Sequence, residues 1–201
     1  IGGSASEDSL AYFRDADQFR NFTLLELPHH GPSPDAAARS PDYATTIVRN
    51  FLYSAFALRQ WDALQASTDP QVAAIAARSV KELRYHRRHA RDWLVRLGDG
   101  TAESHDRTQA ALEHLFAYTA EFWTATSDEA AAIANGAAAD VDMFWADWDS
   151  DADDAFAQAT LRRPAPHGAP PAGKQGRHSH HLAGLLVEMQ SLARQHPAAS
   201  W

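Results

Sequence analysis

The sequence has almost no pattern typical of β-strands, and this absence restricts the possible folds more than any other feature. Alternating β-branched runs and Asn-Gly turns are missing, whereas alanine-rich stretches with apolar residues three and four positions apart recur. Such spacing places apolar side chains on one face of a helix, and that face must pack against other helices. The sequence therefore predicts an all-α, ferritin-like helical bundle with additional C-terminal helices.

Turn and cap signals divide the chain into helical segments. The clearest start is Asp69-Pro70, where the aspartate caps a helix and proline takes the first helical position, and this helix should end at Gly98-Asp99-Gly100. Ser4 and Glu7 have the spacing of a capping box. Two irregular, proline-rich connections are expected at 28–41 and 162–176. The expected helices span about 7–27, 42–66, 70–97, 104–125, 128–134, 138–161 and 178–195.

Composition excludes several kinds of protein. The 201 residues suffice for one domain with a substantial core, so we expect a single domain over residues 1–201, with the bundle core at about 7–125 and C-terminal helices at about 138–196. The chain has no cysteine, which excludes disulfides, thiolate catalysis and iron–sulfur clusters. Its formal net charge of −8 argues against nucleic-acid binding. Membrane-spanning runs and signal-peptide patterns are absent from the sequence, and the lack of cysteine suits the cytoplasmic protein that we expect.

Charge is distributed unevenly along the chain. Residues 71–97 carry seven Lys and Arg against two acids, whereas residues 121–158 carry ten acids and no Lys, Arg or His. One interpretation is that both blocks are solvated helix faces. The other is that one or both blocks face a partner or an anionic ligand.

The segment Lys81–His86 resembles a metal-ligand motif that has lost a ligand. Bundles that hold two irons take Glu-x-x-His from each of two helices and a further Glu from each of the other two. Here Glu82 is followed at that spacing by Tyr85, a phenol that replaces the expected imidazole, and the histidine comes one residue later at His86. Both Glu82 and His86 are predicted to lie on an apolar stripe and to be buried with a partner, because helical spacing aligns residues 75, 79, 82, 86, 90, 93 and 97.

The other expected ligand positions are also incomplete. No Asp or Glu occurs between Tyr43 and Trp61, so the nearest oxygen donors of that helix are Tyr53 and Ser54. In the first helix, Asp15 is followed by Gln18 where an imidazole would stand. We therefore interpret Asp15, Gln18, Tyr53, Ser54, Glu82, Tyr85 and His86 as vestigial ligand positions.

A second cluster precedes the last helix. His178 and His181 are three residues apart with His180 beside them, but a third metal ligand is not evident, and a position at the surface or in an interface between chains is the simpler interpretation. Lys174 and Arg177 place two cations before a helix N-terminus, where free N–H groups attract phosphate or carboxylate. Anion or coenzyme docking and an ordinary surface loop both remain open.

Several of these segments resemble one known family. They are LAYFRDADQFRNFTLLEL at 10–27, DPQVAAIAA at 69–77, KELRYH at 81–86, WLVRLGDGT at 93–101, GKQGRHSHHLAGLL at 173–186 and EMQ at 188–190. In order and with small gaps, from about Asp8 to Trp201, they resemble the C-type subunit of the phenylacetyl-CoA epoxidases (PaaC).

The resemblance implies a non-catalytic, structural subunit of a multicomponent diiron monooxygenase in phenylacetate catabolism. It implies a heterodimer with the homologous A-type catalytic subunit, which carries the diiron centre, so no cofactor is expected in this chain. A reductase supplies electrons, and one oxygen atom of O2 is added to the ring of phenylacetyl-CoA. The small B-type subunit and the reductase are further expected partners. A contact with phenylacetyl-CoA or a partner is expected at Lys174, Arg177, His178, His180 and His181.

The chain departs from the family pattern in two places. Family members have a preceding helix, and this chain starts near its end, so the first family helix is expected to be missing and an apolar groove to be open. The family's His-Thr-Glu-His reads His178-Ser179-His180-His181 here, with His180 where the acid usually stands. Two alternatives remain: an independent metal-binding helical protein that uses Glu82, His86 and the 178–181 histidines, and a helical adaptor unrelated to oxygenation.

Overall fold

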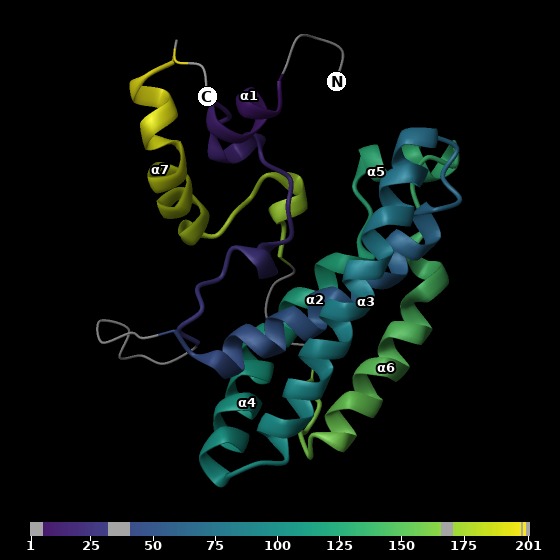
Figure 1. Ribbon diagram of the computed structural model, residues 1–201, viewed down its shortest axis with the longest axis vertical. Helices are drawn as coiled ribbons and strands as arrows, with labels where there is room; N and C mark the ends of the chain where they lie inside the picture. Colours follow the sequence, from purple (N-terminus) through teal and green to yellow (C-terminus); the bar gives the residue numbers. More distant parts are fainter. Residues whose placement is uncertain (1–5, 32–40, 166–170, 198, 200–201) are drawn as a thin grey trace. The chain divides into compact units, whose positions relative to one another are not determined.

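The fold is built from helices. The computed structural model describes residues 6–31, 41–165, 171–197 and 199, and within these ranges the only β-type pairing is one isolated bridge between Ala172 and Arg177. The prediction of an all-α protein is confirmed (Figure 1). None of the helices in these ranges is long and apolar enough to cross a membrane.

Contacts divide the chain into two compact units, each described by itself below. The terminal unit combines residues 1–28 with residues 171–201, and the central unit comprises residues 29–170. The expectation of one domain over the whole chain stays a prediction.

The central unit is organised around α2, which packs against α3, α4 and α6. Its core is aromatic: the rings of Phe56 and Phe122 stack at 4.5 Å, and the Trp148 Nε1 donates a hydrogen bond to the Leu52 carbonyl oxygen at 3.3 Å. Burying each such side chain contributes about 1.5–3 kcal/mol. The elements are α2 (Tyr43–Leu64), α3 (Pro70–Gly98), α4 (Ala102–Leu115), η4 (Phe116–Trp123), α5 (Ser127–Ala134), η5 (Val141–Phe144) and α6 (Trp145–Gln158).

The long helix α3 matches its predicted bounds. The Asp69 side chain accepts hydrogen bonds from the amides of Gln71 and Val72, and Pro70 occupies the first turn. At the other end, Gly98 lies so close to Ala159 that a Cβ at this position would collide with the Ala159 carbonyl. Glycine is therefore required here by the close approach of two backbones and not by a left-handed conformation, since Gly98 is not among the residues with positive φ.

The terminal unit consists of short N-terminal elements packed on the last helix. Gln190 of α7 donates hydrogen bonds to the carbonyl oxygens of Ala11 and Arg14 at 3.1 and 2.9 Å, and Arg194 donates to Phe13 at 3.2 Å. The elements are α1 (Glu7–Tyr12), η1 (Ala16–Gln18), η2 (Thr23–Leu25), η6 (Gly173–Gln175) and α7 (His180–Gln195).

The prediction of one continuous helix over 7–27 is wrong, because α1 ends at Tyr12. A continuing helix would use the carbonyls of Ala11 and Arg14 internally, but α7 takes them as acceptors. Asp15 then begins a new, separately capped turn. This break could not be read locally, since the competing donors come from the other end of the chain.

Smaller differences concern helix ends. The helix expected at 104–125 tightens into a 3-10 turn at Phe116, and the one expected at 138–161 begins as the 3-10 turn η5. The last helix begins at His180, two residues later than predicted. Ser4, and with it the predicted capping box, lies outside the described residues; Ser6 caps α1 by accepting from the Ser9 amide at 3.2 Å. Parts of both predicted connections, 32–40 and 166–170, also lie outside them.

Candidate functional site

The prediction that Glu82 and His86 face the core is wrong, since both side chains are exposed. The buried stripe of α3 is turned by roughly a quarter of a helical turn from the predicted one. It consists of Ala76, Val80, Ala90, Leu94 and Gly98. Small residues in this stripe let α2 approach closely. The same rotation of the helix directs Arg87 toward α6, where it pairs with Asp151.

Tyr85, which stands at the predicted imidazole position, also points outward. Its side chain is 54% exposed and lies 5.8 Å from the ring of His86 and 5.8 Å from that of His89. The Arg88 guanidinium lies 6.0 Å from the centre of the same ring. The three residues of the lost motif therefore lie on the surface of the central unit.

The donors on α2 have ordinary structural contacts. The buried Ser54 hydroxyl donates to the Phe51 carbonyl oxygen at 3.4 Å. Tyr53 is half-buried with its ring 6.4 Å from that of Phe122, and burial raises the pKa of its phenol. Tyr53 thus packs against the aromatic core of the central unit.

Asp15 and Gln18 belong to the terminal unit and form a capping box. The Gln18 Oε1 accepts a hydrogen bond from the Asp15 amide at 2.8 Å. The Asp15 carboxylate forms an exposed ion pair with Arg194 at 3.0 Å. Both residues therefore cap the short helical turn η1.

The residues at the ligand positions do not fit a two-iron centre. Such a centre needs carboxylates and imidazoles that converge inside the bundle, whereas Glu82 and His86 point to solvent. In the described ranges, no group of three or more His, Asp or Glu side chains is arranged to hold a metal ion. The interpretation of these positions as vestigial stays a prediction.

The central unit has a buried ion cluster that the sequence did not single out. The Asp151 carboxylate on α6 is almost fully buried and accepts from Arg87 Nε at 2.8 Å and from Arg59 Nη1 at 3.3 Å, with a second short contact to Arg87 Nη2. Arg91 Nε lies 4.0 Å from it. The cluster joins α2, α3 and α6. The sequence did contain one signal for this cluster. Asp151 follows the core residue Trp148 by three positions, a spacing that places both side chains on the same face of the helix.

This cluster shows how some charges of the basic block (71–97) and the acidic block (121–158) are used. Burial by itself raises the pKa of Asp151, but hydrogen bonds and charges from Arg87 and Arg59 outweigh burial and lower the pKa overall. Outside the basic block, Arg163 forms more exposed ion pairs with the neighbouring Asp149 and Asp153. Part of the basic block is thus paired with the acidic block inside one unit, an arrangement that neither interpretation had anticipated.

The terminal unit is held by a buried carboxylate, Glu26. It accepts hydrogen bonds from His178 Nδ1 at 2.6 Å, from Asn21 Nδ2 at 2.8 Å, and from both the amide and the hydroxyl of Ser179 at 2.8 Å. The other ring nitrogen, His178 Nε2, lies 3.1 Å from the Phe19 carbonyl oxygen. His178 and Ser179 thus tie the start of α7 to the buried Glu26.

Among the predicted docking residues at 174–181, the side chain of His178 is buried, whereas the others are exposed or half-buried. His178 is buried and engaged by Glu26, so its side chain is not available to a ligand. Lys174 lies 5.3 Å from the centre of the Phe22 ring, and Arg177 is exposed with a hydrogen bond to Gln175 at 3.2 Å. His180 is exposed, and its ring lies 3.8 Å from that of the half-buried His181. Docking of a coenzyme or partner at these residues stays a prediction.

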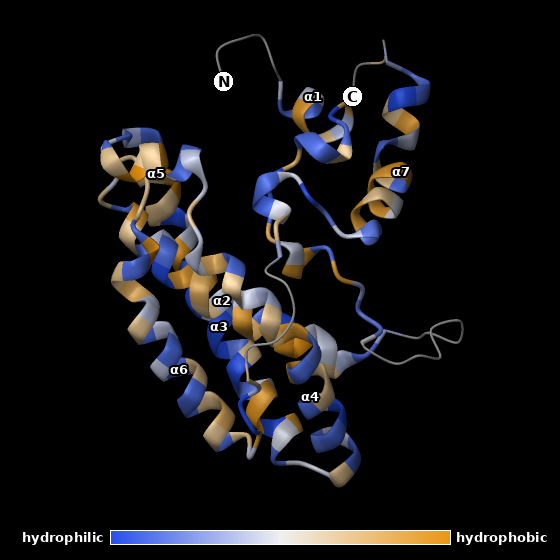
Figure 2. Cartoon of the chain, turned by 180° about the vertical axis from the view of Figure 1, so that it is seen from behind, coloured by the Kyte–Doolittle hydropathy of each residue, from blue (hydrophilic) through white to orange (hydrophobic). Residues whose placement is uncertain are grey.

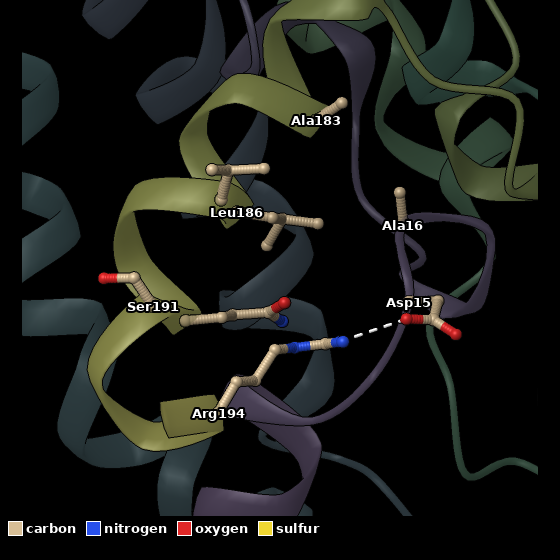
Figure 3. Close-up of a pocket in the computed structure, with 8 residues that line it drawn as sticks. Asp15, Ala16, Ala183, Leu186, Ser191 and Arg194 are labelled. Carbon is tan, nitrogen blue, oxygen red and sulfur yellow. Dashed lines mark hydrogen bonds and ion pairs between the residues drawn. The ribbon is translucent and has the colours of Figure 1, made fainter. Parts of the chain in front are cut away.

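Helix α7 carries apolar side chains on more than one face. One face packs on α1, while Leu185, Val187 and Leu192 are 54%, 74% and 53% exposed. A groove of about 430 Å³ runs along the helix, with the Arg194–Asp15 ion pair at one end (Figure 3). It is lined by Asp15, Ala16, Ala183, Leu186, Val187, Gln190, Ser191 and Arg194.

Comparisons with known proteins agree with the resemblance noted above. Residues 1–201 match the family described as phenylacetic acid catabolic protein. The chain is 36% identical over 201 residues to the C-type subunit of the 1,2-phenylacetyl-CoA epoxidase of Escherichia coli (strain K12), and the match covers 100% of this chain and 77% of that protein. The chain belongs to the phenylacetic acid catabolic protein family.

Proposed function

We propose that this chain is a non-catalytic structural subunit of a multicomponent diiron monooxygenase that epoxidises the ring of phenylacetyl-CoA in phenylacetate catabolism. The observation that carries the proposal is the match over the whole chain to a protein named as the C-type subunit of that epoxidase. The site geometry supports the same role, because Glu82 and His86 point outward and the α2 donors are engaged in the core. The diiron centre would then belong to the A-type catalytic partner.

The physical role of such a subunit is to bury and orient a partner surface. Permanent interfaces are large and apolar, and exposed apolar side chains on α7 and on α3 supply suitable contact area. The exposed large apolar side chains on these helices are Ile75, Tyr85, Leu185, Val187, Met189 and Leu192. The small B-type subunit of the epoxidase and the reductase are proposed as further partners in the cytoplasm.

Co-expression with an A-type catalytic subunit from the same bacterium tests the proposal. We expect the two chains to co-purify, and we expect phenylacetyl-CoA-dependent O2 consumption with the reductase to need both. The Glu82→Ala and His86→Ala variants should support the same activity as the unmodified chain, because neither side chain binds iron in this proposal. If the catalytic partner were equally soluble and equally active by itself, the structural role would be wrong.

Elemental analysis separates this role from an independent metal-binding protein. We expect the purified chain to contain no stoichiometric iron, manganese or zinc. A stoichiometric metal that disappears in the Glu82→Ala variant, but not in the Asp154→Ala control on exposed α6 surface, would favour the metalloprotein instead.

A further inference from the structure

The outward side of α3 is strongly basic although the chain as a whole is acidic. Figure 2 shows this helix mainly in the hydrophilic colour. Five exposed cations, named here the basic strip, extend over about 27 Å of the helix at 1.5 Å per residue. They are Arg78, Lys81, Arg84, Arg88 and Arg96. A concentrated positive surface on a chain of net charge −8 is a local feature and not a consequence of overall composition.

The cations of the basic strip take little part in internal ion pairing. In the ranges that the structure describes, Arg84 is the one member with a carboxylate at ion-pair distance, Asp62 at 3.5 Å, and both side chains are mostly exposed. The arginines that hold the fold, Arg87 and Arg91, lie along the flank of the helix beside Asp151 of α6. The fold therefore does not require the charge of the basic strip.

An exposed aromatic residue lies in the middle of the basic strip. Tyr85 is 54% exposed, stacks on His89 at 5.8 Å, and has the Arg88 guanidinium 6.0 Å from its ring centre. Further along, Arg96 lies 5.4 Å from the ring of Trp93. Tyrosine, tryptophan and arginine are the residue types that most often carry binding energy at protein interfaces. This favours a protein surface as the ligand over a simple polyanion.

We infer that the basic strip is a docking surface for a protein partner that presents an acidic helix or acidic segment. Charge complementarity carries the choice of partner: the face bears five cations, and the acids Glu82 and Asp92 on the same helix leave a net positive charge. The chain already shows the same kind of pairing internally, between α3 arginines and the acidic helix α6. The inference goes beyond the structural role proposed above and does not depend on it.

The test measures binding of a fluorescent, glutamate-rich helical peptide to the full chain by anisotropy. We expect binding at roughly 0.02 M salt that is strongly weakened at roughly 0.5 M salt, because exposed charges are screened over a few ångströms there. The triple variant Lys81→Glu, Arg84→Glu, Arg88→Glu should bind about tenfold or more weakly, since three attractive contacts become repulsive. A matched control changes three exposed arginines outside α3, Arg20, Arg107 and Arg162, to Glu and alters net charge equally.

The control and a second probe make the inference refutable. The control triple should lose less than about threefold in affinity, because its residues do not belong to the basic strip and exposed charges are screened. Equal losses in both triples would show that only net charge matters and would overturn the inference. Tighter binding of single-stranded DNA or polyphosphate than of the peptide, abolished by the strip triple, would also overturn it, because the surface would then select phosphate. Circular dichroism of both triples verifies that each remains folded.

Discussion

Replacing Asp151 by asparagine should destabilise the central unit through loss of one buried charge. The substitution keeps the shape of the side chain but removes the carboxylate that Arg87 and Arg59 share. The asparagine amide group would place two N–H donors beside guanidinium donors, so at least one hydrogen bond of the cluster is lost. Arg87 and Arg59 would then lie beside each other without a counter-charge.

The expected magnitude follows from burial. Removing one partner of a fully buried ion pair costs about 3–5 kcal/mol. The Asp151 side chain is 7% exposed, but those of Arg59 and Arg87 are 20% and 30% exposed, so water can recover part of the lost interaction. We therefore expect a loss of about 2–3 kcal/mol in the free energy of unfolding.

Urea unfolding near neutral pH, followed by circular dichroism and tryptophan fluorescence, measures this loss. The control is Asp154→Asn on the exposed side of the same helix, for which we expect a change within about 0.5 kcal/mol. A midpoint for Asp151→Asn that coincides with that of the control would refute the assignment of the cluster as a stabilising element.

The same residue predicts a pH dependence. The folded pKa of Asp151 is lowered below its ordinary value of 3.8, so its contribution to stability is complete above that value and is lost as pH falls through the lower folded pKa. In acid, the stability difference between the unmodified chain and Asp151→Asn should therefore shrink. A difference that stayed constant from neutral pH down to below the folded pKa would contradict the linkage.

Two further changes test other parts of the fold. Glu26→Gln should lower the free energy of unfolding by about 2–4 kcal/mol and speed amide hydrogen exchange at the start of α7, because the buried hydrogen-bond donors lose their anionic acceptor. The control is the exposed His180→Ala. Equal protection from exchange in both variants would contradict the role of Glu26. Gly98→Ala should destabilise the central unit by about 1–3 kcal/mol in thermal unfolding, because the new Cβ atom collides with Ala159. Gly184→Ala adds a Cβ atom in open space, so it should be neutral or stabilising by up to about 1 kcal/mol. The opposite order of these two glycine variants would show that the contact at Gly98 is misassigned.

The pairing of opposite charge blocks has a consequence for assembly. Asp151 pairs with Arg87 on the flank of α3 beside α6, whereas the cations of the basic strip are exposed on the same helix. One helix thus contributes to internal stability with one face and to the proposed recognition with another. This division explains how seven cations can lie on a single helix of an acidic chain.

The sequence alone determined the helical class and the bounds of the best-defined helices. Asp69 and Pro70 act within the first turn of their own helix, so their effect can be read from neighbouring residues. The family could also be identified, because its motifs are contiguous segments. The incomplete ligand set was evident for the same reason, since missing carboxylates between Tyr43 and Trp61 are a property of sequence.

Only the tertiary structure decided which way α3 faces and where the first helix ends. Hydrophobic spacing placed Glu82 inward, whereas in the structure Glu82 is exposed and Arg87 pairs with Asp151, a residue more than sixty positions away. The first helix ends where Gln190, near the other end of the chain, donates hydrogen bonds to the carbonyl oxygens of Ala11 and Arg14. Both outcomes rest on long-range polar contacts with buried or partly buried groups. The energy of such contacts exists only after distant segments have come together, and local sequence patterns therefore do not contain it.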